Sequence, residues 1–176
     1  MFHPLDFIPS VAQKKAFFAF LALTLGLFGV FRYLDAPLRN PAAPSGIVSF
    51  ELAGTPERAD SIIQSWDARS QLFAAFGLGL DYLFMPAYAL TLSIGVLMAL
   101  RKRGGVFAKL GAYVGWGALL AGLFDAVENV ALWRLLSGIS TPFCPRAAAF
   151  AATVKFALIV LGLIFALTGW LLPKKT

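Results

Sequence analysis

The chain has 176 residues, of which 59% are hydrophobic and only 14% are charged. Soluble domains usually contain about 45–50% apolar and about 25% charged residues, so this composition excludes an ordinary soluble protein. The single cysteine, Cys144, excludes an intramolecular disulfide and a thiolate zinc site, and the single histidine, His3, excludes a multi-histidine metal site. The net charge of +6 alone would suggest nucleic acid, but its distribution along the chain argues against that partner.

Four apolar segments are each close to the roughly 20 residues that a spanning helix needs. The first helix is expected to begin at Ser10, because Gln13 follows with the spacing of a capping box. We therefore predict an all-α fold, a single four-helix transmembrane bundle in which the lipid bilayer is the partner. The predicted spans cover residues 16–33, 72–100, 106–136 and 147–172.

The connection at residues 34–71 is long enough to hold structure of its own. Apolar and polar residues alternate over Ile47–Leu52, which predicts a short extended segment. Thr55 is a suitable N-cap for an amphipathic helix that continues from Glu57, and Trp66 is interpreted as an aromatic anchor at the membrane interface. The connection is thus expected to cap the bundle.

Basic residues stand where the apolar segments begin or end. With four spans, these basic flanks all fall on the same side of the membrane, and the positive-inside rule places them, with both termini, in the cytoplasm. The same rule explains the net charge without nucleic acid. The flanks are Lys14 and Lys15 before the first span, Arg101–Arg103 between the second and third, and Lys174 and Lys175 after the fourth.

Ionisable residues inside the predicted spans are the strongest functional signal, because charge in hydrocarbon is costly. Asp81, Asp125 and Lys155 each lie about 27–30 Å from the cytoplasmic edge at 1.5 Å per residue, so three helices place charge in one layer. Glu128 and Asn129 follow Asp125 by three and four residues and share its helix face. Small residues on the same stripes predict that these groups point into the bundle.

Three interpretations of this cluster remain open. It could form an outward-facing site for a cation, a lipid head group or a small polar ligand, with Glu51 as a lid contact. Tyr82 and Tyr88 are further candidate contacts of such a ligand. The cluster could instead be a structural clasp in a subunit of a membrane complex or a homo-oligomer, in which Lys155 pairs with one acid and Tyr82 or Tyr88 completes the hydrogen bonds. A lipid-modifying enzyme using paired carboxylates is the third interpretation. We prefer binding to catalysis, because paired acids in a membrane bundle are not specific to enzymes.

The three acids also allow a hard-metal site. Asp81, Asp125 and Glu128 offer only oxygen ligands, which suit Mg²⁺ or Ca²⁺, although nothing in their spacing requires a metal. Formally, three acids against Lys155 leave a charge of −2. A protonated carboxyl, a bound cation or an arginine from the outer connection would have to compensate this charge.

Short motifs resemble small bacterial four-helix membrane proteins of unassigned function. The similarity rests on the run Phe50–Thr55, on Asp81-Tyr82 and on the run Asp125–Asn129. It implies an integral protein of the bacterial inner membrane and no activity.

Overall fold

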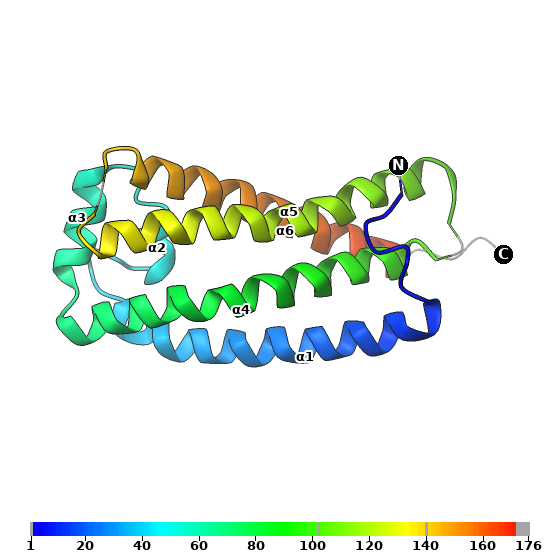
Figure 1. The fold of residues 1–176 in the computed structure, drawn as a ribbon, viewed down its shortest axis with the longest axis horizontal. Coiled ribbons are helices and arrows are strands. Elements are labelled where there is room, and N and C mark those ends of the chain that lie inside the picture. The colour runs from blue at the N-terminus through cyan, green and yellow to red at the C-terminus, as the bar shows by residue number, and fades with distance from the viewer. Residues whose placement is uncertain (1, 102, 140, 172–176) are drawn as a thin grey trace. The chain divides into compact units, whose positions relative to one another are not determined.

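The computed structural model describes residues 2–101, 103–139 and 141–171, and within these ranges the fold is entirely helical. Four long helices account for most of the chain, and three short ones lie in the connection between the first two (Figure 1). The elements in chain order are α1 (Ser10–Asp35), η1 (Ala36–Leu38), α2 (Ile47–Glu51), α3 (Pro56–Ser65), α4 (Ala68–Ala99), α5 (Gly105–Leu136) and α6 (Cys144–Leu171).

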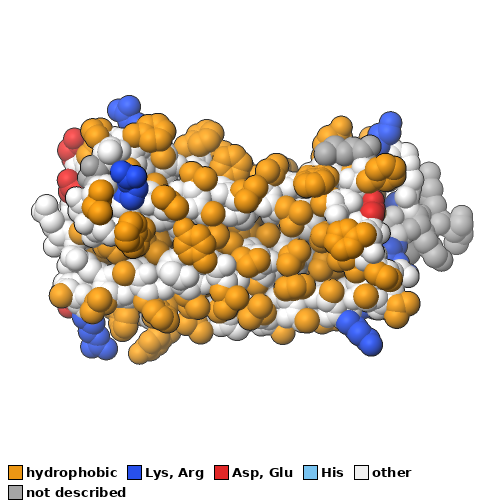
Figure 2. Space-filling model, in the orientation of Figure 1, with side chains coloured by type: hydrophobic (Ala, Val, Ile, Leu, Met, Phe, Trp, Pro, Cys, Tyr) orange, Lys and Arg blue, Asp and Glu red, His pale blue; other side chains and the backbone are white. Residues whose placement is uncertain are grey.

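The predicted four-helix bundle is confirmed. α1 begins at Ser10 as expected, and α4, α5 and α6 cover the other three predicted spans within a few residues of their ends. All four helices are long and apolar enough to cross a membrane, with mean hydropathies between 1.5 and 2.4. Hydrophobic side chains dominate the surface of the long helices seen in Figure 2. The chain is therefore a multi-pass integral membrane protein.

Internal contacts divide the chain into two compact units, which we describe separately. Unit 1 comprises Met1–Leu25, Pro86–Leu123 and Lys155–Thr176, and unit 2 comprises Gly26–Met85 and Phe124–Val154. Each of the four long helices contributes one part to each unit. The short helices η1, α2 and α3 belong to unit 2.

In unit 1, glycines allow the helices to approach closely. A Cβ at Gly162 of α6 would overlap Leu92 of α4, and a Cβ at Gly111 of α5 would overlap Phe165 of α6. Because lipid offers no hydrophobic driving force between helices, such small residues permit the van der Waals contact that holds a membrane bundle together. The stripe of small residues on α6 thus packs inward, as the sequence predicts.

In unit 2, the connection at residues 34–71 folds into a cap with its own apolar core. Phe50 of α2, Ile62 of α3 and Trp66 are buried together with Leu132 of α5. The indole Nε1 of Trp66 donates a hydrogen bond of 2.8 Å to the Leu38 carbonyl. Trp66 is therefore a core residue of the cap, and its interpretation as an interface anchor was wrong.

The extended segment predicted over Ile47–Leu52 is also wrong, because this stretch contains helix α2. Gly46 precedes the helix with a φ of 60°, a conformation that favours glycine, and the Asp35 carboxylate accepts a 2.7 Å hydrogen bond from the Ile47 amide. A Cβ at Gly46 would overlap that carboxylate. Five residues are too few to separate a period of two from one of 3.6, and these distant contacts select the helix.

Candidate functional site

The acidic cluster of unit 2 is built on a single stripe of α5. Asp125, Glu128 and Asn129 are 2%, 0% and 2% exposed, and Leu132, one turn further on, is fully buried. Residues three and four apart share one face of a helix, so the periodicity that predicts a common stripe is confirmed by the burial. Val127 and Val130 between them are more than half exposed. The polar stripe thus faces the interior of the unit and the valines face outward.

Asn129 joins this stripe to α4. Its Nδ2 donates a 2.9 Å hydrogen bond to the Asp81 carboxylate and a 3.2 Å bond to the Leu78 carbonyl. Asp81 itself is half-buried. The structure therefore brings Asp81 and Asn129 into direct contact, with Asp125 and Glu128 on the same face of α5.

The other predicted site residues lie on α2, α4 and α6. Tyr82 is 51% exposed, so its side chain lies at the surface of α4 and not in the interior of unit 2. Glu51 is the last residue of α2 and is half-buried in the cap. Tyr88 and Lys155 are buried, but they belong to unit 1, where the Lys155 ammonium lies 4.7 Å from the ring centroid of Phe156.

The arginines of the connection at residues 34–71 are all exposed and have partners of their own. None of the contacts that the structure gives for their guanidinium groups is with the acidic cluster. Instead, Arg39 forms a 2.9 Å ion pair with Asp35, Arg58 donates a 2.7 Å bond to the Ala42 carbonyl, and Arg69 stands 5.4 Å from the ring centroid of Phe73.

The three acids were also considered as ligands of a divalent metal. Within the described residues, no group of three or more His, Cys, Asp or Glu side chains has an arrangement that could hold a metal ion. Asp81, Asp125 and Glu128 therefore do not stand as a ready-made set of ligands for Mg²⁺ or Ca²⁺, which would require several oxygens at about 2.0–2.6 Å from the ion.

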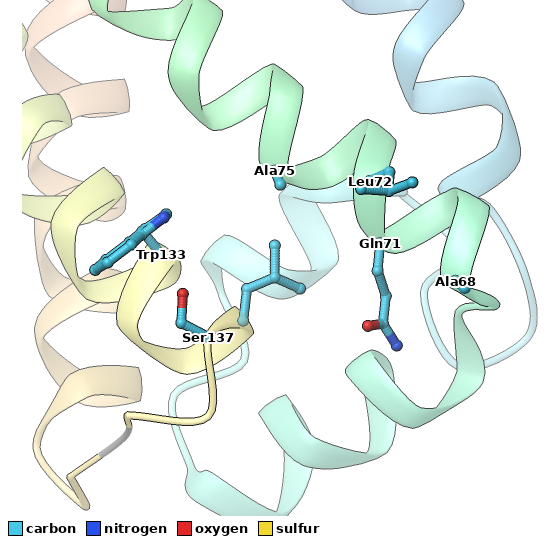
Figure 3. A pocket seen from close by; sticks show the side chains of 7 residues that line it. Ala68, Gln71, Leu72, Ala75, Trp133 and Ser137 are labelled. Carbon is cyan, nitrogen blue, oxygen red and sulfur yellow. The ribbon is translucent and has the colours of Figure 1, made fainter.

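Unit 2 also contains a groove that the sequence did not reveal. It has a volume of about 390 Å³ and lies between the first turns of α4 and the last turns of α5 (Figure 3). Gln71 closes one side, since its Nε2 donates 3.1 Å bonds to the Ile63 and Trp66 carbonyls. Its lining is of ordinary interface residues, which carry no sequence signal: Ala68, Gln71, Leu72, Ala75, Trp133, Leu136 and Ser137.

Comparison of the chain with protein-family models, with curated proteins and with solved structures found no match.

Proposed function

We propose that this multi-pass membrane protein binds a cationic group at the cluster of Asp81, Asp125, Glu128 and Asn129. The observation that carries the proposal is the burial of two acidic side chains, Asp125 and Glu128, one turn apart on α5. Two carboxylates in an apolar interior cost several kcal/mol unless their charge is compensated. Residues of this kind inside a membrane helix serve function more often than stability.

The charge count supports a bound cation. The three acids exceed Lys155, the lysine at the same predicted depth, by two formal charges. The sequence left three ways to compensate them: an outer-loop arginine, a proton or a cation. The contacts given for the guanidinium groups of Arg39, Arg58 and Arg69 are with Asp35, Ala42 and Phe73, and of the other two ways the proposal takes the cation.

The cationic group is monovalent in this proposal, since the acids do not stand as a divalent metal site. An alkali ion and the ammonium of a lipid head group or of a small polar ligand are both monovalent cations, and a pair of carboxylates can bind either. Sodium and potassium on one side and choline on the other are the probes that distinguish the two sources.

The test is thermal unfolding of the purified protein in detergent at fixed pH and ionic strength. Sodium, potassium, choline and magnesium chlorides are compared with N-methylglucamine chloride, whose cation is too bulky and hydrated for a buried site. We expect a saturable rise of the melting temperature in sodium, potassium or choline, because a ligand at 100 times its Kd stabilises the folded state by about 2.7 kcal/mol. Choline alone would indicate an ammonium head group.

Matched variants locate the effect. Asp125→Asn and Glu128→Gln keep side-chain size but remove charge, so we expect them to fold and to lose the cation-specific rise. Asp60→Asn is the control, since Asp60 is exposed on α3 of the same unit. Identical melting temperatures of the wild type in all five salts would contradict the proposal, as would equal loss of the rise in Asp60→Asn.

A second function, a structural clasp in a membrane-complex subunit, is favoured by one observation. The two hydrogen bonds of Asn129 tie α5 to α4 without any ligand. If the cluster is a clasp, Asp125→Asn lowers the melting temperature by the same amount in every salt, and the melting temperature of the wild type does not depend on the cation.

A further inference from the structure

The chain before α1 forms a compact turn rather than an extended tail. The His3 amide donates a 2.9 Å bond to the Asp6 carboxylate, and the Asp6 amide donates a 3.1 Å bond to the His3 carbonyl. The Leu5 amide donates a 3.2 Å bond to Nδ1 of the His3 ring. This last bond is the histidine counterpart of an Asx-turn, in which a side chain accepts from the amide two residues on. We call residues 2–9 the N-terminal strap.

The strap is held on α4 and α5 of unit 1. His3 is 4% exposed, and its ring occupies the space that a Cβ at Gly115 of α5 would need. Ser93 of α4 donates a 3.1 Å bond to the Gly115 carbonyl, so the ring enters a notch where the two helices are joined. Trp116 donates a 3.2 Å bond to the Phe2 carbonyl and fixes the start of the strap, which is dark blue in Figure 1.

Apolar contacts complete the attachment. Leu5 is buried in a cluster with Phe17 of α1 and with Ile94 and Leu97 of α4. A fully buried leucine contributes about 1.5–3 kcal/mol, which is enough to hold a short segment but not to make its release impossible. The strap therefore depends on few contacts, and of its two ionisable side chains, His3 and Asp6, His3 is the buried one.

We propose that the N-terminal strap is a pH-operated latch, which opens when His3 takes up a proton in the Gly115 notch. In the closed state Nδ1 accepts from the Leu5 amide, so this nitrogen carries no proton. Protonation at Nδ1 would direct its N–H at the Leu5 N–H and would bury a charge. The groups facing the ring are the Asp6 carboxylate from the strap, the Ser93 backbone from α4 and Gly115 from α5.

The sign of the pH dependence follows from these surroundings. Burial lowers the pKa of His3 below its ordinary value of 6.5, and this outweighs the Asp6 carboxylate and the Ser93 backbone, which both favour the protonated ring. The open strap thus binds the proton more tightly than the closed strap. Closure is strongest above pH 6.5 and weakens as the pH falls below 6.5 toward the lowered pKa.

Amide hydrogen exchange of the strap, followed by mass spectrometry of the full chain in detergent, tests the latch. Exchange rates are divided by the intrinsic rate at each pH, so that only protection is compared. In the wild type we expect protection of residues 2–9 to fall between pH 7.5 and pH 5.0. The fall is up to about tenfold for each unit by which the His3 pKa differs between the open and the closed strap. Unchanged wild-type protection over this range would overturn the latch.

Three variants separate titration from packing. His3→Asn keeps an acceptor for the Leu5 amide but cannot titrate. We therefore expect the strap of this variant to have the same protection at pH 7.5 and at pH 5.0. Gly115→Ala fills the notch and should open the strap at every pH, whereas Gly79→Ala, which has nothing within 4 Å of the added Cβ, should not. Wild-type protection in Gly115→Ala, or the full pH response in His3→Asn, would contradict the proposal.

Discussion

Asn129→Leu tests how much of the stability of unit 2 depends on the contact between α4 and α5. The substitution keeps the number and branching of the side-chain heavy atoms and removes two hydrogen bonds, one to the Leu78 carbonyl and one to the Asp81 carboxylate. Side-chain hydrogen bonds between membrane helices contribute about 0.6 kcal/mol on average and about 1.7 at most. The bond to a carboxylate belongs to the upper part of that range, because a charged acceptor strengthens it. We therefore expect a loss of about 2 kcal/mol.

Reversible unfolding in mixed detergent micelles measures this loss. Thr153→Ala is the matched control, because the Thr153 hydroxyl bonds to the Ala149 carbonyl within α6 and joins no two helices. A loss in Asn129→Leu no larger than in the control would refute the reasoning. It would mean that the two bonds exchange for equally good ones when the helices separate.

Two further predictions concern the cap and the entry to α4. Trp66→Phe keeps an aromatic ring against Phe50 but leaves the buried Leu38 carbonyl without its indole donor. We expect the free energy of unfolding to fall by about 1–2 kcal/mol. Gln64→Ala, at an exposed position of α3, is the control and should cause no loss. The side chain of Ser70 and its amide, which donates a 2.7 Å bond, both hydrogen-bond to the Asp67 carboxylate and lower the pKa of that carboxyl below 3.8. The carboxylate thereby caps the first turn of α4, and the stability that this cap adds is complete above pH 3.8 and is lost as the pH falls through the lowered pKa. Acid unfolding curves of Asp67→Asn should therefore lack that loss of stability. Equal acid sensitivity in the variant would refute the capping role.

The spans could be predicted because hydropathy is a local property. A helix such as α6 needs no distant contact to be recognised, since its apolar run is long enough to cross a bilayer. The stripe of Asp125, Glu128 and Asn129 could be predicted for the same reason, because a helix fixes which residues share a face. Where the sequence pattern spans several turns, the structure agrees with it.

The parts that were missed depend on contacts between distant residues. Trp66 is buried because its indole reaches the Leu38 carbonyl, 28 positions earlier in the chain. α2 is helical because Asp35 accepts from the Ile47 amide and Gly46 supplies a positive φ. His3 is buried because Gly115 lacks a side chain, and no periodicity links those two positions.

The cap constrains how a cation would reach the acids. Leu132 lies one turn beyond Asn129 on α5 and is packed in the same apolar core as Phe50 and Trp66 of the cap. An apolar layer therefore separates the polar stripe from the cap, and charge cannot cross such a layer cheaply. Asp81 is the half-buried member of the cluster, whereas Asp125 and Glu128 are fully enclosed. If a cation binds as proposed, it would meet Asp81 first and pass inward to α5, and the proposal then predicts that substitutions at Asp81 alter access while substitutions at the α5 acids alter affinity.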